Sequence, residues 1–313
     1  MLFRLSAILL LSLAALGARA DVSLLVSIKP LQLIAAAVQD GVGQPGVLLP
    51  PGASAHHYML KPSDARRLQQ ADLFYWIGPD LEGFLPRMLA TRDKPSLALA
   101  SLPDMHLRHF GETHHDHDHG HAHGDDDHDD DHHDHEHRPG SLDAHLWLLP
   151  ENAKLIARRM AADLARLDAA NADRYQVNLQ AFEQRLGELD QRLRERLAPL
   201  QGKPFFVFHE TYDYFEQAYG LRHAGVISLG EVQPGARQVA RLRERLRAAG
   251  PTCLFHEPPQ APRLAHTLIE GLPARLAPLD ALGHDQAVDA RGYERLLDTL
   301  GSQLTGCLTT PGA

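Results

Sequence analysis

The chain has 313 residues, enough for two lobes with hydrophobic cores, since domains commonly contain about 100–200 residues. Of its 40 acidic residues, 11 lie in segment 112–137, and two of its 31 basic residues, Arg4 and Arg19, lie in a predicted signal peptide. The remainder has 29 acidic and 29 basic residues, which argues against the basic face that nucleic-acid binding requires, so we expect no nucleic-acid partner.

Residues 1–20 have the pattern of a secretory signal peptide. Arg4 precedes a 12-residue apolar run, residues 5–16, and the sequence ARA at 18–20 is a typical cleavage site. The run is shorter than the about 20 residues of a membrane span. A buried N-terminal helix is the alternative. We expect an exported protein that begins at Asp21 and is not inserted stably into a membrane.

Short apolar runs alternate with amphipathic stretches along the rest of the chain, which is typical of parallel sheets covered by helices. The predicted strands are residues 23–28, 47–49, 73–77, 205–208, 225–228, 253–255 and 276–279. The predicted helices, apart from one longer helix, are residues 30–40, 62–70, 151–167, 237–249 and 263–270. The expected fold class is therefore α/β, with mainly parallel sheets in two lobes.

The longest predicted helix spans residues 171–200, with Asn171 as its N-cap. Apolar residues recur along it at seven-residue intervals in two interleaved sets and form one stripe about 40 Å long. The sets are Tyr175, Phe182 and Leu189, and Leu179, Leu186 and Leu193. A coiled-coil dimer is the alternative. We expect a monomer in which this helix joins an N-terminal lobe, 21–170, to a C-terminal lobe, 201–313.

Residues 112–137 interrupt the N-terminal lobe with the sequence ETHHDHDHGHAHGDDDHDDDHHDHEH, which has no large apolar residue. A segment of this composition cannot form a core, so we expect a disordered insertion. Ordering it around an ion costs entropy, so its histidines predict weak, secondary metal sites. These histidines are His114, His115, His117, His119, His121, His123, His128, His132, His133, His135 and His137.

The chain has two cysteines, Cys253 and Cys307. In an exported protein an even number favours a disulfide, which would close a loop of about 54 residues and contribute about 3–4 kcal/mol of stability. A pair of thiolate ligands for a soft metal is the alternative, although such ligands usually lie closer together in sequence.

Histidines at the ends of predicted strands are the candidate ligands outside the insertion, because ligands of open α/β folds gather at the carboxyl ends of strands. His209 directly follows the apolar run FFVF, and His56 and His57 follow the strand-and-loop sequence VLLPPGASA. His145 lies in SLDAHLWLLPEN, where the fold resumes after the insertion. Each also has an ordinary interpretation, as a histidine hydrogen-bonded to backbone, solvent or core groups.

Asp280 follows the predicted strand 276–279 and precedes a loop, so it is either a fourth ligand or a turn residue. Three histidines and a carboxylate from separate loops suit Zn²⁺, which accepts tetrahedral coordination by nitrogen and oxygen. Such long spacing between ligands is a weaker signal than a compact metal-binding motif.

Three further carboxylates adjoin strand-end histidines in sequence. Asp143 and Glu210 are neighbours of His145 and His209, and Glu257 lies in the sequence FHEPP. They are either partners that fix the tautomer of a ligating histidine or ordinary surface carboxylates, and the surface interpretation is slightly favoured.

Six motifs in order carry a resemblance to a known family: PPGASAHHYMLKPSD, ADLFYWIGPDLE, DAHLWLLPEN, FFVFHETYDYFEQAYGL, LFHEPP and LAPLDALG. From Val22 to Cys307 the chain resembles the ZnuA-type periplasmic zinc-binding proteins of bacterial zinc ABC importers. The His-rich insertion and the two cysteines also resemble this zinc branch of the metal-receptor family. The resemblance implies two α/β lobes, a long rigid helix between them, zinc in the cleft, and delivery to an inner-membrane ABC permease.

The resemblance also implies a ligand set. Through the motif HxYxLxPSD, the family's first metal-binding histidine corresponds to His56, and His57 takes a variable position. The second and third correspond to His145 and His209. Manganese and iron relatives tend to have Glu at the third position, so His209 indicates zinc. Asp280 matches a carboxylate that binds the metal in those relatives, and it is either the fourth ligand or a nearby carboxylate.

Four functions fit these features of the sequence. The favoured one is a periplasmic zinc receptor that is not an enzyme. A manganese or iron receptor of the same family and a periplasmic metal buffer or chaperone that acts through the insertion are alternatives. A zinc hydrolase or lyase is a further alternative, because three histidines and a water also form catalytic zinc sites. The sequence lacks an HExxH motif for such an enzyme.

Overall fold

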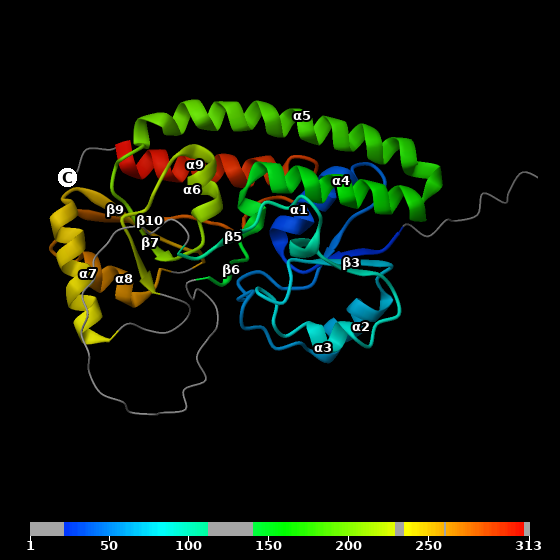
Figure 1. The fold of residues 1–313 in the computed structure, drawn as a ribbon, viewed down its shortest axis with the longest axis horizontal. Coiled ribbons are helices and arrows are strands. Elements are labelled where there is room, and N and C mark those ends of the chain that lie inside the picture. The colour runs from blue at the N-terminus through cyan, green and yellow to red at the C-terminus, as the bar shows by residue number, and fades with distance from the viewer. Residues whose placement is uncertain (1–21, 112–139, 229–234, 260, 310–313) are drawn as a thin grey trace, which may run out of the picture.

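The computed structural model describes residues 22–111, 140–228, 235–259 and 261–309, which form an α/β fold with two parallel four-stranded sheets (Figure 1). The predicted fold class is confirmed. The predicted signal peptide and the His-rich insertion lie outside the described residues. Within those residues, no helix is both long and apolar enough to cross a membrane.

The first sheet has the strand order β2-β1-β3-β4, and every neighbouring pair is parallel. Its two central strands, with sequences LLV and LFYW, are buried along their whole length, as expected where both faces of a sheet are covered. The three strands predicted here are confirmed, each shorter or shifted by a residue, whereas β4 was not predicted. The elements are β1 (Leu24–Val26), α1 (Lys29–Val38), β2 (Gly46–Val47), α2 (Pro62–Gln70), β3 (Leu73–Trp76), α3 (Pro86–Leu89), β4 (Ser96–Ala98) and the 3-10 turn η1 (Leu99–Ser101).

A short antiparallel pair of strands, β5 (Arg108–His109) and β6 (Leu142–Asp143), flanks the insertion in sequence. Two-residue strands are too short to show an alternating pattern, so neither was predicted. The chain then passes through the 3-10 turn η2 (Leu146–Leu148) into α4 (Pro150–Leu167), which begins with a proline at its first position.

The long helix α5 (Ala172–Leu197) buries all six residues of the predicted stripe. It ends three residues before the prediction because Pro199, which has no backbone N–H, lies in the following turn. Asn171 occupies the N-cap position of α5, as predicted, but its side chain caps no N–H of the helix, and its Nδ2 donates to Asp168 Oδ2 at 2.6 Å. The flanking 3-10 turns are η3 (Ala169–Asn171) and η4 (Ala198–Leu200).

The second sheet has the order β10-β9-β7-β8, again with every neighbouring pair parallel. All four strands predicted here are present, but α6 and α9 were not predicted. The elements are β7 (Phe206–His209), α6 (Asp213–Tyr219), β8 (Gly225–Ser228), α7 (Ala236–Ala249), β9 (Thr252–His256), α8 (Arg263–Ile269), β10 (Ala274–Pro278) and α9 (Gly292–Thr309).

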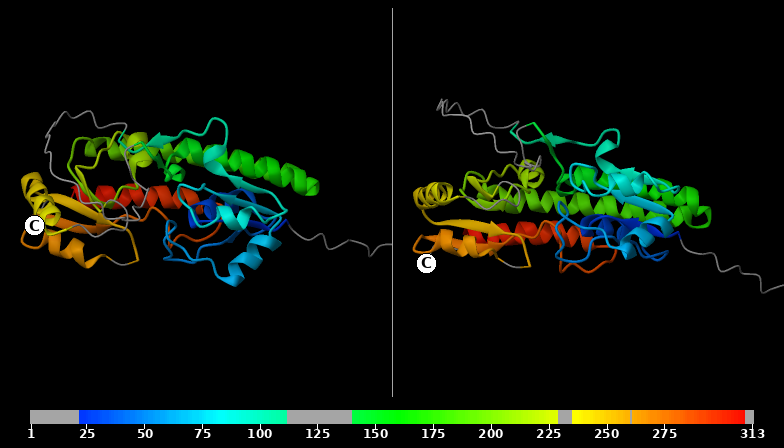
Figure 2. Two further views of the ribbon diagram at one scale, coloured as in Figure 1. Left: turned by 60° about the horizontal axis from the view of Figure 1, so that its bottom comes forward. Right: turned by 90° about the horizontal axis from the view of Figure 1, so that it is seen from below.

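The C-terminal helix α9 connects the two halves of the molecule in addition to α5. It runs alongside α5 and also contacts α1 of the first half (Figures 1 and 2). Arg185 of α5 forms an ion pair with Glu294 of α9 at 2.6 Å. A single hydrophobic core extends from β1 and α1 through α4 and α5 to β9 and α9. The predicted single joining helix is therefore only part of the connection between the sheets.

The predicted disulfide between Cys253 and Cys307 is present. Cys253 lies on β9 and Cys307 lies near the end of α9, so the bond fastens the C-terminal helix to the second sheet. The alternative of two thiolate metal ligands is wrong.

Candidate metal centre

A pocket of about 310 Å³ lies where loops of both halves meet, and it brings together the four residues predicted as ligands. His56 comes from the loop between β2 and α2, and His145 from the turn after β6. His209 is the last residue of β7, and Asp280 lies two residues after β10. Residues far apart in sequence therefore line one cavity, as expected for the carboxyl ends of parallel strands.

The structure distinguishes the two adjacent histidines of the first loop. Ser54 Oγ accepts the backbone N–H groups of both His56 and His57 at 3.2 Å, which holds the loop in a tight turn. His56 lines the pocket, whereas the exposed His57 does not. The ring centroids of His56 and His145 are 5.6 Å apart. Imidazoles that bind one zinc ion at about 2.1 Å have centroids roughly 5 Å apart, so this spacing suits a shared ion.

His145 is oriented by Asp143. One carboxylate oxygen of Asp143, Oδ1, lies 2.8 Å from His145 Nδ1 and also accepts the backbone N–H of His145 at 3.0 Å. Burial raises the pKa of Asp143 to about 7, although the backbone hydrogen bond acts in the opposite direction. The surface interpretation of Asp143 is wrong, because the residue is only 1 % exposed. With Nδ1 held by Asp143, an ion would bind His145 through Nε2.

His209 is oriented by Glu257 rather than by its sequence neighbour Glu210. The Oε2 atom of Glu257 lies 2.9 Å from His209 Nδ1. Glu210 is buried, and no hydrogen bond of the described residues joins it to His209. Burial, followed by the charge of Asp213, raises the pKa of Glu210 to about 7. Successive residues of a strand point to opposite faces, so adjacency in sequence did not identify the partner.

Asp280 is held by a set of hydrogen bonds in its own loop. Its Oδ1 accepts the N–H groups of Leu282 and Gly283 at 3.1 and 2.8 Å, and its Oδ2 accepts that of His284 at 2.7 Å. Burial acts to raise the pKa of Asp280, but the hydrogen bonds from His284 outweigh it, so the pKa lies below its usual value. Asp280 therefore supplies a negative charge to the pocket at neutral pH, whether or not it contacts an ion.

His284 is a pocket residue that was not predicted from the sequence. Its Nδ1 lies 3.0 Å from Asp280 Oδ1, and its side chain lines the same cavity. The four-residue spacing from Asp280, with Gly283 between them in a left-handed conformation, was the available signal.

Hydrogen bonds across the pocket set the distance between its walls. Trp147 Nε1 donates to Ala281 O at 2.9 Å, and Tyr293 OH donates to Trp147 O at 2.5 Å. Trp147 follows His145 by two residues, and Ala281 follows Asp280 directly. The bond to Ala281 therefore joins the loop that carries a histidine of the first half to the loop that carries a carboxylate of the second, and the bond from Tyr293 attaches the first loop to α9.

The donor set suits a divalent transition metal. Imidazole nitrogens at the pocket wall, two of them oriented by carboxylates, match the chemistry of zinc sites, in which the second ring nitrogen commonly contacts a carboxylate. The histidines predicted as secondary sites, between residues 114 and 137, lie outside the described residues.

Comparisons with known proteins identify the family of the chain. A sequence model of the family described as "Zinc-uptake complex component A periplasmic" matches residues 24–307. The chain is 41 % identical over 313 residues to a "High-affinity zinc uptake system protein ZnuA" of Paracoccus denitrificans, covering 95 % of each chain. It is 36 % identical over 292 residues to the protein of that name from Yersinia pestis, covering 92 % of each.

The fold is similar to that in a solved structure described as "Crystal structure of ZnuA", with a TM-score of 0.74 at 23 % identity. The match covers 92 % of this chain and all of the other. The sequence matches extend over nearly the whole chain and include both sheets and every candidate ligand. The chain therefore belongs to the ZnuA family, the periplasmic component A of zinc-uptake complexes.

Proposed function

We propose that the protein captures Zn²⁺ in the periplasm and delivers it to an ABC-type permease of the inner membrane. The observation that carries this proposal is the convergence of His56, His145 and His209 on one pocket, with carboxylates at Nδ1 of the latter two. The names of the relatives, which describe zinc uptake, support the same cargo.

The proposed ligands are His56, His145 and His209. Three neutral imidazoles leave the charge of the ion uncompensated, so the carboxylate of Asp280 stabilises the bound cation by its charge. The hydrogen bonds that Asp280 already accepts favour this role over that of a fourth ligand. A nitrogen donor at position 209, in place of a carboxylate, favours zinc over manganese or iron.

The proposed organisation is an exported monomer with an N-terminal lobe, 21–170, a joining helix, 171–200, and a C-terminal lobe, 201–313. Residues 1–20 are the proposed signal peptide. The pocket lies at the junction of the lobes, so both lobes supply ligands to the ion. A permease that separates these loops would lower the affinity of the site and release the ion.

A binding protein is favoured over a zinc hydrolase. A hydrolase needs a carboxylate or histidine positioned to take a proton from the zinc-bound water. The two carboxylates that line the pocket, Glu257 and Asp280, are each hydrogen-bonded to a histidine ring. This arrangement orients ligands and compensates charge, which is the requirement of a reversible cation site.

A zinc competition titration of the mature chain tests the proposal. Replacing His56, His145 or His209 singly by Ala is expected to weaken the tight site by about 100-fold or more, since each supplies a metal–nitrogen bond. His57→Ala is the matched control, because His57 shares the loop but not the pocket. Unchanged affinity in any of the three variants would contradict the assignment.

Deleting residues 112–137 separates the receptor from a metal buffer. A receptor keeps one tight zinc site and loses weaker ones, because the ligands of the pocket lie outside the insertion. A buffer that acts through the insertion loses all tight binding. The number of tightly bound zinc ions, measured by elemental analysis after dialysis, decides between them.

A further inference from the structure

A second group of histidine and carboxylate side chains lies around α6, outside the pocket that holds His209. Asp213, Glu216 and His223 each place a potential ligand atom within 4.8 Å of the other two. His223 Nδ1 lies 2.9 Å from Glu216 Oε1 and 4.0 Å from Asp213 Oδ1. Ligands that bind one zinc ion at about 2.1 Å are roughly 3.4 Å apart, so these spacings suit a common ion.

The local sequence DYFEQAYGLRH builds this group. Asp213 and Glu216 are three residues apart on α6, so both side chains lie on one helix face. Gly220, in the left-handed conformation, ends the helix and reverses the chain. The backbone N–H of His223 then donates to Glu216 Oε2 at 3.0 Å, which fixes the imidazole beside the two carboxylates.

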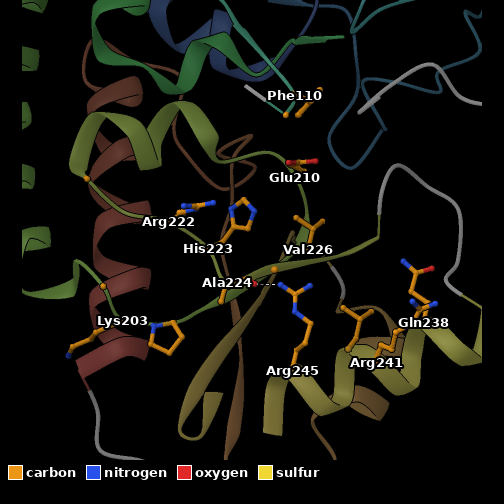
Figure 3. A pocket seen from close by; sticks show the side chains of 16 residues that line it. Phe110, Lys203, Glu210, Arg222, His223, Ala224, Val226, Gln238, Arg241 and Arg245 are labelled. Carbon is orange, nitrogen blue, oxygen red and sulfur yellow. Dashed lines mark hydrogen bonds between the residues drawn. The ribbon is translucent and has the colours of Figure 1, made fainter. Parts of the chain in front are cut away.

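Glu210 is an independent sign of a ligand at this place. It is only 9 % exposed, and no hydrogen bond or ion pair among the described residues involves it. Its side chain lines the same pocket as His223, a cavity of about 1040 Å³ (Figure 3). The charges of Asp213, His223 and Glu216 all act on it. The carboxylate of this otherwise buried residue therefore faces the pocket, where a cation would supply its partner.

Negative charge is in excess on this side of the pocket. The carboxylates of Glu210, Asp213 and Glu216 surround His223, and burial together with the charge of Glu216 raises the pKa of Asp213 to about 6. Basic residues line the pocket as well, but Arg241 and Arg245 lie on α7, on the opposite wall (Figure 3). Two basic residues lie on the near side: exposed Arg222, and Arg108, whose charge acts on Asp213.

We propose that Asp213, Glu216 and His223, with Glu210, form a second binding site for a divalent transition-metal ion such as Zn²⁺. The site is separate from the candidate centre between the two sheets and does not depend on its function. One imidazole and three carboxylates compensate the charge of the ion fully. The ion reaches them from the solvent through the pocket that Glu210 and His223 line.

Anomalous diffraction from crystals of the mature chain, grown with zinc in excess over the cleft site, tests the proposal. We expect an anomalous peak within bonding distance of His223 Nδ1 in the unmodified protein and in Glu244→Gln, an exposed control on α7. The peak should be lost in Asp213→Asn/Glu216→Gln. A filled cleft with no peak at His223, or a peak that persists in the double variant, would overturn the proposal.

A second measurement uses Glu210→Gln, which breaks no hydrogen bond of the described fold and so should fold normally. Zinc should shift the ring-nitrogen NMR resonances of His223, and Glu210→Gln should require about tenfold more zinc for the same shift. Resonances of His223 that stay unchanged at saturating zinc would refute the site. The resonances of His209 report the cleft in the same spectra, so failure of one site is distinguishable from failure of the other.

Discussion

The pocket around His209 and the cluster around His223 use the same residue types in opposite proportions. In the pocket, three histidines come from two loops and the end of β7, and carboxylates hold the rings of His145 and His209. In the cluster, one histidine is surrounded by three carboxylates from the short segment 210–223. The first arrangement selects ions that prefer nitrogen, whereas the second attracts a divalent cation mainly by charge.

The two regions also differ in what assembles them. The cluster requires only segment 210–223, which contains the end of the loop after β7, α6 and the turn that follows α6. The pocket requires both sheets at the correct separation, which the hydrogen bond from Trp147 to Ala281 helps to maintain. A change in the relative position of the two halves would therefore alter the pocket and leave the cluster intact, which suits capture and release of an ion.

The largest expected difference is in stabilisation by zinc. At about 1,000 times the dissociation constant, zinc should raise the free energy of unfolding by about 4 kcal/mol. His209→Ala should remove about two-thirds of this gain or more, since a site weakened 100-fold keeps about 1.4 kcal/mol at the same zinc concentration. His223→Ala should retain most of the gain, because the tight site lies in the pocket. Calorimetric unfolding with and without zinc measures both. Equal losses in the two variants would contradict the distinction between the sites.

The next largest effect separates the two carboxylates near His209. Glu257→Gln should weaken zinc binding in the pocket by about 10- to 100-fold, since Glu257 fixes the tautomer and orientation of the ring. Glu210→Gln should leave the affinity of the pocket nearly unchanged, although Glu210 is adjacent in sequence. Competition titrations provide the comparison, and a larger loss in Glu210→Gln would reverse the assignment.

A smaller effect is expected for Asp280→Asn. Asn can accept some of the loop's N–H groups but removes the negative charge from the pocket, at a cost of about 1 kcal/mol or roughly fivefold in zinc affinity. A loss as large as that of a histidine variant would instead identify Asp280 as a ligand. The same titration, compared with His57→Ala as the neutral reference, measures the difference.

The smallest effect is a pH dependence of thermal stability that has opposite signs in metal-free and zinc-saturated protein. The folded-state pKa values of Asp213 and Glu210 are raised to about 6 and about 7, from 3.8 and 4.5. The stability that they contribute is full below their unfolded values and is lost as the pH rises through 6 to 7. Burial acts to lower the pKa of His223, but the hydrogen bond to Glu216 raises it, which has the same sign.

Metal-free protein should therefore unfold at a higher temperature near pH 5 than near pH 7.5, by about 2 °C or more. Zinc-saturated protein should show the reverse order, because protonation of the imidazoles below about pH 6.5 releases the ion. Thermal unfolding in a chelator and in zinc, at both pH values, checks the two signs. Identical trends in chelator and in zinc would exclude histidine ligation in the pocket.

Much of the fold was predictable because local sequence patterns specify the central strands and the long helix. The strands β1 and β3, with sequences LLV and LFYW, are apolar at every position, as strands buried on both faces must be. The seven-residue repeat identified the buried face of α5. Among the elements that were not predicted, β5 and β6 are too short to show a period.

The sequence alone determined which residue types end which strands, and so it identified His56, His145, His209 and Asp280 as candidate ligands. Only the tertiary structure decided that Glu257, and not Glu210, contacts His209, and that α9 packs across the first half. It also brought His223 beside the carboxylates of α6. Periodicity and turn residues act over a few positions, whereas these contacts depend on strand order and on which face of a strand each side chain takes.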